Sequence, residues 1–154
     1  MQRARTPLAI ILAGLAFFYF ETFLVGFSAA LAYPTWYAEF AAKHSELGFA
    51  LWDLFTVVPV VIVSALIVGA VLGRVINRNF FVSGLAAVIV AIAYATAQVA
   101  PDLGLLTALR IHLFPVYWFL APSYLAIWLA LPLATMFFGA KTRGRQNDIA
   151  DALN

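Results

Sequence analysis

Residues 7–32 read PLAIILAGLAFFYFETFLVGFSAALA, an apolar run with a single carboxylate, Glu21, close to its middle. A helix that crosses a bilayer needs roughly 20 apolar residues, and its backbone polar groups must be hydrogen-bonded within the helix. This stretch is therefore predicted to span a membrane. An acidic side chain at the centre of such a helix costs about 2.5–3.5 kcal/mol on insertion scales. We expect Glu21 to be neutral and hydrogen-bonded to another helix.

The composition of the whole chain agrees with this interpretation. Its 154 residues are 65% hydrophobic and only 10% charged, whereas soluble domains are about 25% charged. The basic residues lie in short clusters beside apolar runs, a pattern that encodes membrane topology and argues against nucleic-acid binding. Because the chain has no cysteine, disulfides, thiolate metal sites and thiol catalysis are excluded.

The beginning of the chain has some features of a secretory signal. Arg3 and Arg5 precede the apolar run, and residues 30–32 (ALA) resemble a signal-peptidase site. The run is longer than the roughly 7–15 apolar residues of a signal-peptide core. We therefore expect an uncleaved signal anchor.

Four apolar segments account for most of the sequence. They are predicted to form an all-α, single-domain bundle of four transmembrane helices with up-down topology, spanning about residues 7–32, 48–73, 80–100 and 114–138, followed by a polar tail at 141–154. Pro59 is expected to kink the second span. The segment 103–114 is too short to cross, and an interfacial or partly re-entrant helix is predicted there. A short interfacial helix is predicted in the other outer loop.

The basic residues predict the orientation. Seven lie on one side of the predicted membrane and two on the other, with Arg3, Arg5, Arg74, Arg78, Lys141, Arg143 and Arg145 opposed to Lys43 and Arg110. Because cytoplasmic loops carry the excess of Lys and Arg, both termini are predicted to be cytoplasmic in a bacterial inner membrane.

Small residues repeat at helical spacing and predict close helix packing. Gly14 shares a helical stripe with Glu21 and Ser28, since the three are seven residues apart. The remaining packing positions are Ala65, Gly69 and Gly73 in the second span, Ala87 and Ala91 in the third, and Ala126 and Ala130 in the fourth.

Polar side chains are predicted to gather in the outer half of the bundle. From a rise of about 1.5 Å per residue, Glu21 lies near the midplane, and Asp53 and Gln98 lie roughly 10 Å further out. The predicted intramembrane polar site is Glu21, Asp53, Thr56, Tyr94 and Gln98, with a rim of Arg110, His112 and His44. Asp53 has two alternative roles, capping its own helix or pairing with Arg110.

Metal binding and catalysis have weaker signals. The two histidines, on different outer loops, lack further ligands at metal-binding spacing, so no metal or other cofactor is expected. Glu21 and Asp53 are predicted to lie at different depths, and no serine nucleophile motif accompanies them, so hydrolysis is not expected.

Four short spans, cytoplasmic termini and a carboxylate in the first helix are similar in outline to the small multidrug-resistance exporters. That resemblance is one of architecture, without a shared sequence motif. It implies that Glu21 exchanges protons for a cationic substrate.

Three functions follow as hypotheses. The first is a noncatalytic accessory or assembly subunit of a membrane complex, because packing residues are abundant and catalytic motifs are lacking. The second is a small proton-coupled transporter or ion pathway that uses Glu21. The third is a lipid-binding or lipid-modifying protein with an outer-leaflet site at Arg110 and His112. The expected partners are the lipid bilayer and other membrane subunits or a second copy of the chain.

Overall fold

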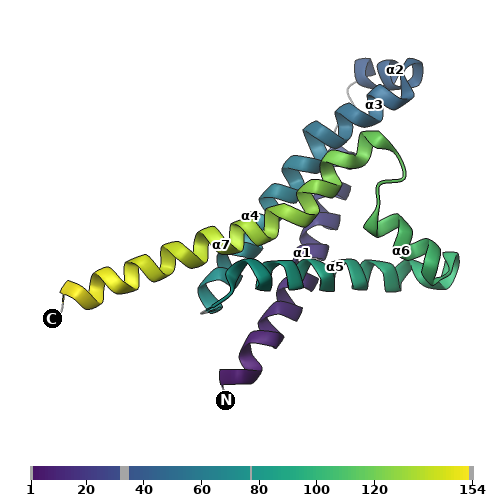
Figure 1. Cartoon of the computed structure of the whole chain (residues 1–154). Helices are drawn as coiled ribbons and strands as arrows, with labels where there is room; N and C mark the ends of the chain where they lie inside the picture. Colours follow the sequence, from purple (N-terminus) through teal and green to yellow (C-terminus); the bar gives the residue numbers. More distant parts are fainter. Residues whose placement is uncertain (1, 32–34, 77, 153–154) are drawn as a thin grey trace.

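The chain folds into helices connected by short turns. The computed structural model describes the backbone of residues 2–31, 35–76 and 78–152, and side chains within 5–28, 36–76 and 78–144. The long helices are α1 (Gln2–Leu31), α4 (Val58–Val75), α5 (Phe80–Leu103) and α7 (Ala121–Ala152) (Figure 1). The short helices are α2 (Thr35–Lys43), α3 (Ser45–Trp52) and α6 (Leu105–Leu113). The described backbone contains no strand.

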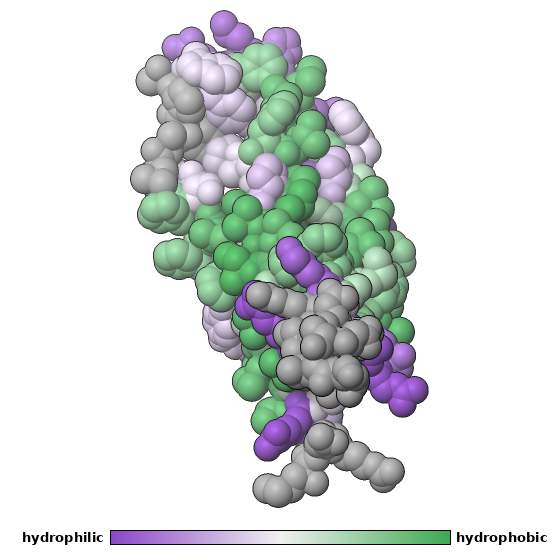
Figure 2. Space-filling model, turned by 90° about the vertical axis from the view of Figure 1, so that its left-hand side faces the viewer, coloured by the Kyte–Doolittle hydropathy of each residue, from purple (hydrophilic) through white to green (hydrophobic). Residues whose placement is uncertain are grey.

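Four helical segments are long and apolar enough to cross a membrane. They cover Arg5–Ser28, Ser45–Val75, Phe80–Leu103 and Trp118–Gly144. Figure 2 shows hydrophobic residues over the middle of one face of the molecule and hydrophilic residues towards its two ends. This distribution fits a protein whose middle lies in hydrocarbon. The prediction of an all-helical protein with four candidate spans is confirmed.

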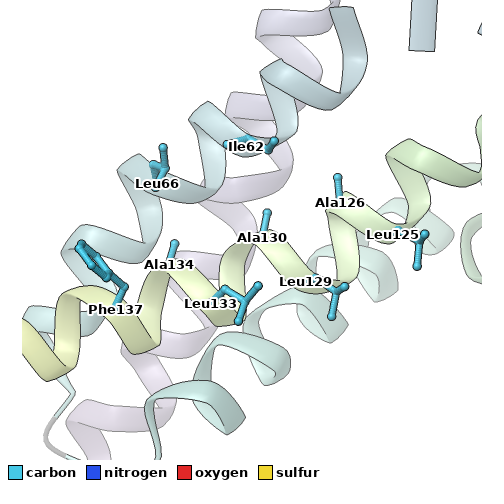
Figure 3. A pocket seen from close by; sticks show the side chains of 9 residues that line it. All are labelled: Ile62, Leu66, Leu125, Ala126, Leu129, Ala130, Leu133, Ala134 and Phe137. Atoms are coloured by element: carbon cyan, nitrogen blue, oxygen red, sulfur yellow. The ribbon is translucent and has the colours of Figure 1, made fainter. Parts of the chain in front are cut away.

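Helices α4 and α7 lie side by side along most of α4 and form the most extensive contact of the fold (Figure 1). Glycines permit this close approach. A Cβ atom added to Gly69 would lie 2.6 Å from Ala134 Cβ, and one added to Gly73 would lie 2.8 Å from Thr135 O. The predicted alanines of the fourth span are on the same contact, because Ala126 and Ala130 point from α7 towards α4 in Figure 3.

Helix α1 crosses α5 at Gly14. A Cβ atom added to Gly14 would lie 2.5 Å from the carbonyl oxygen of Ala87. Ala65 and Ala87 are fully buried, and Ala91 is 5% exposed. The structure therefore places the predicted packing residues of the first three spans at helix contacts, where small side chains let backbones approach.

The second span is longer than predicted and contains a π-helical turn. It runs from Ser45 to Val75, and residues Asp53–Val57 (η1) form the π turn between α3 and α4. The Val58 N–H bonds to the Asp53 carbonyl, five residues earlier. Pro59 follows directly and has no N–H to bond the carbonyl of residue 55, so the helix widens instead of closing an α-turn. The distortion expected from Pro59 is a π-helical turn at Asp53–Val57.

The boundaries of the last two spans also differ from the prediction. Helix α5 continues through Pro101 to Leu103. The fourth span begins with the 3-10 turn η2 (Trp118–Leu120), not at residue 114. Phe114 has extended backbone angles (φ −132°, ψ 135°), as expected for the residue before Pro115. The predicted polar tail continues α7 as helix to Ala152.

The chain reverses direction at Gly104, between α5 and α6. Gly104 has φ 80° and ψ 148°, a conformation that is essentially restricted to glycine. Helix α6 then packs back along α5 (Figure 1). The eight residues from Leu105 to His112 correspond to about 12 Å of helix at 1.5 Å per residue. The turn therefore brings His112 back into the bundle from the predicted rim.

We expect Gly104→Ala to destabilise this turn by about 1–3 kcal/mol through backbone strain. Among the described residues, no atom lies within 4 Å of the added Cβ atom, so we attribute the loss to backbone strain. Gly26→Ala is the matched control, because its Cβ position is also open but lies inside α1. Detergent unfolding of both variants measures the difference. A Gly104→Ala protein as stable as Gly26→Ala would contradict the assignment of the strained turn.

Candidate functional site

Glu21 lines a cavity of about 300 Å³ between four helices. Helix α1 contributes four side chains, α5 three, α6 one and α7 two: Phe17, Phe18, Glu21 and Thr22; Ala91, Ile92 and Ala95; His112; and Tyr124 and Ile127. A cavity of this size is at the lower end of the range for small-molecule sites. The small side chains of α5 leave the space that Glu21 and His112 share.

The Glu21 carboxyl group is half-buried on the cavity wall. It forms no hydrogen bond or ion pair with the described residues, and no lysine or arginine is among the described residues that line the cavity. The interhelical hydrogen bond expected from the sequence is therefore not observed in this part of the chain. Glu21 instead faces a space in which a ligand or water can reach it.

His112 presents its ring to the same cavity in a defined orientation. Its Nδ1 atom lies 2.8 Å from the carbonyl oxygen of Ala108, one turn earlier in α6. A carbonyl oxygen only accepts, so Nδ1 donates, and in a neutral ring Nε2 carries the lone pair. Nε2 has no partner among the described residues. The cavity thus contains a carboxyl group and an imidazole nitrogen that is available to a proton.

Tyr124 joins two walls of the cavity. Its hydroxyl donates a hydrogen bond to the carbonyl oxygen of Ile111. The bond links α7 to α6 at the residue preceding His112. Tyr124 therefore helps to fix the position from which the imidazole reaches the cavity.

Asp53 does not line this cavity and instead caps another helix. It is 2% exposed, and its Oδ2 atom accepts a hydrogen bond from the Ser123 N–H at 3.1 Å. Ser123 is in the first turn of α7, where backbone N–H groups lack intrahelical partners and the helix dipole favours a carboxylate. The sequence left open whether Asp53 caps its own helix or pairs with Arg110. The structure assigns it to the start of α7.

Asp53→Ala is expected to destabilise the protein by about 1–2 kcal/mol, because it removes this cap. Asp53→Asn should lower the free energy of unfolding by less, since its side-chain oxygen still accepts the hydrogen bond from the Ser123 N–H. Unfolding in detergent measures both. An equal loss of stability in Asp53→Ala and Asp53→Asn would contradict the capping role.

The other predicted polar residues lie at separate places. Tyr94 forms a hydroxyl–hydroxyl hydrogen bond of 2.5 Å with Tyr19, next to the ring of Phe18. Thr56 is half-buried, whereas Gln98 and Arg110 are exposed. His44 is exposed and packs against the Phe40 ring at a centroid distance of 5.2 Å. Of the eight predicted polar positions, only Glu21 and His112 line the Glu21 cavity.

The sequence interpretation missed Phe17, Phe18, Thr22 and Tyr124 as cavity residues. Phe17 and Phe18 precede Glu21 by four and three positions, so helical spacing alone puts them on its face. The sequence position of Tyr124 does not relate it to Glu21, because the rotation of α7 about its axis decides where the Tyr124 ring lies. No group of three or more metal-ligating side chains occurs among the described residues.

No protein-family model, curated protein or solved structure matches this chain.

Proposed function

We propose that this protein is a small membrane transporter that binds an organic cation at Glu21 and exchanges it for protons. The proposal rests on one observation, the presence of Glu21 and His112 on the wall of a single cavity. The sequence favoured an accessory subunit. A cavity-facing carboxyl group with no partner among the described residues gives the transporter the better support.

The cavity lining suits a cation. An ionised Glu21 provides the opposite charge, and the lining includes aromatic rings of the kind that attract cations, namely Phe17, Phe18 and Tyr124. The volume of about 300 Å³ suits a compact cation. An anion would meet the Glu21 carboxylate without a lysine or arginine among the described lining residues to balance it.

Protons and the cation would compete for the same carboxylate. Protonated Glu21 no longer attracts a cation, so proton uptake by Glu21 favours release of the cation. Cation binding is therefore expected to strengthen as the pH rises. The proposed orientation, with up-down spans and cytoplasmic termini in a bacterial inner membrane, is supported by the seven-to-two distribution of basic residues.

Tetraethylammonium is a suitable probe, because it is compact and does not cross lipid readily. Calorimetry on the purified full-length protein should detect binding that tightens with pH and releases protons. Proteoliposomes with an imposed proton gradient should accumulate the radiolabelled probe. Binding that is independent of pH, or uptake equal to that of empty liposomes, would refute the transporter.

The accessory-subunit hypothesis has support from one observation, the exposure of α1. Only 17% of its apolar span is buried in this fold, compared with 44% for α5. Phe23 and Phe27 stack on its exposed surface with ring centroids 6.1 Å apart. A partner helix or a second copy of the chain would cover these rings.

Purification from native membranes in mild detergent tests this alternative. A subunit should carry a stoichiometric partner, and Phe23→Ala with Phe27→Ala should release it. Phe55→Ala is the control, because Phe55 is 70% exposed on a different segment. A chain that purifies alone would exclude the subunit role.

The third hypothesis, a lipid-binding or lipid-modifying protein with a site at Arg110 and His112, has less support. Arg110 and His112 are two positions apart in α6, and residues at that spacing do not face each other on a helix. His112 lines the cavity whereas Arg110 is exposed. This arrangement gives little support to a headgroup site shared by the two side chains.

A further inference from the structure

A second cavity, separate from Glu21, runs between α1 and α4. It is a groove of about 480 Å³ that extends along α1 from Arg5 to Phe20. Ala9, Ala13 and Ala16 recur at helical spacing along its α1 side and keep it open, and α4 provides Val68 and Leu72. Fifteen residues of helix correspond to about 22 Å. One leaflet of the hydrocarbon core is about 15 Å deep, so the groove covers the depth of one leaflet.

The polarity of this groove is concentrated at one end. Arg5 is its only charged lining residue among the described side chains, and every other one is apolar. Arg5 and Val75 both line the groove, and Arg74, the residue before Val75, is exposed, as Arg5 is. The groove between α4 and α7 differs, because its described lining is apolar throughout (Figure 3). A cationic end and a long apolar channel match the layout of an anionic lipid.

We infer that the α1–α4 groove binds one anionic glycerophospholipid from the leaflet on the Arg5 side. One acyl chain lies along the alanines of α1, and the phosphate meets the Arg5 guanidinium, with Arg74 adding positive charge. Guanidinium groups bind phosphate oxygens through paired N–H donors. The acyl chain fills a space that would otherwise lack van der Waals contacts. Inorganic phosphate has no acyl chain to fill the apolar part of the groove, so it is not the proposed ligand.

Native mass spectrometry of the full-length protein with dioleoyl-phosphatidylglycerol and dioleoyl-phosphatidylcholine tests this inference. The chains are identical, so the ratio of bound lipids reports on the headgroup alone. The wild-type protein should prefer phosphatidylglycerol. Arg5→Gln should lower that preference about fivefold, the effect expected for one basic residue near an anionic lipid.

Two further variants separate the headgroup from the chain. Arg110→Gln, at an exposed arginine outside the groove, should leave the preference unchanged. Ala9→Leu fills the groove and should reduce binding of both lipids together. Equal wild-type binding of the two lipids, or a preference that survives Arg5→Gln, would overturn the inference. Neither result depends on transport, so the proposed function is tested separately.

Discussion

Glu21→Gln is expected to abolish proton-coupled uptake of tetraethylammonium and to weaken its binding by roughly 10–100-fold. The amide keeps the size and hydrogen-bonding capacity of the side chain but has no charge to attract the cation. Interactions that involve a charged group contribute about 1.5–3 kcal/mol, which corresponds to that range. The amide also cannot take up the proton that drives release. Radiolabel uptake in proteoliposomes and calorimetry in detergent measure the two effects.

Two controls make this result specific to the Glu21 cavity. Glu21→Asp keeps the acid and should retain pH-dependent binding with reduced affinity, because the shorter side chain reaches less far into the cavity. Glu46→Gln removes an exposed carboxylate at the start of α3 and should change neither measurement. Uptake by Glu21→Gln at the wild-type rate would remove the basis for the proposed function.

Gly73→Leu is expected to cause the largest loss of stability, about 3 kcal/mol, the upper end of the usual cost of overpacking. Backbone atoms of α7 surround the position, with Gly139 N and Thr135 O both 2.8 Å from an added Cβ atom. Backbone cannot move aside as a flexible side chain can, so α4 and α7 must separate. Because their contact is the most extensive of the fold, the whole bundle is affected.

Gly26→Leu provides the matched control for this substitution. The same side chain enters a helix at a position where no atom of the described residues lies within 4 Å of the new Cβ atom. Unfolding in increasing mole fractions of sodium dodecyl sulfate should separate the two variants clearly. Similar midpoints for both would show that close backbone contact at Gly73 does not hold α4 against α7.

The candidate site shows which positions the sequence identifies and which side-chain groupings it does not specify. The lone carboxylate in an apolar helix identified Glu21 without any structural information. Depth estimates then put both in one polar cluster of the outer half, with Glu21 near the midplane and Asp53 roughly 10 Å further out. Depth along the membrane normal does not specify direction around a helix axis, and the two side chains face different neighbours. The first turn of α7 lies beside Asp53, a contact between residues 70 positions apart that the sequence pattern does not specify.

His112 shows the same limit at a reversal of the chain. Its segment was correctly predicted as a short helix, and a re-entrant course was one alternative. The position of His112 in the bundle depends on the Gly104 backbone angles and on the packing of α6 along α5. A sequence pattern contains neither the direction of that turn nor the contact that stabilises it.

The sequence by itself determined that the chain is helical and has four segments able to span a membrane, because hydrocarbon requires long apolar runs with internally bonded backbone. It also determined which positions are small enough for close packing. Only the tertiary structure decided which helix faces each polar side chain. Rotation about a helix axis is set by contacts with its neighbours, and those contacts join residues far apart in the chain.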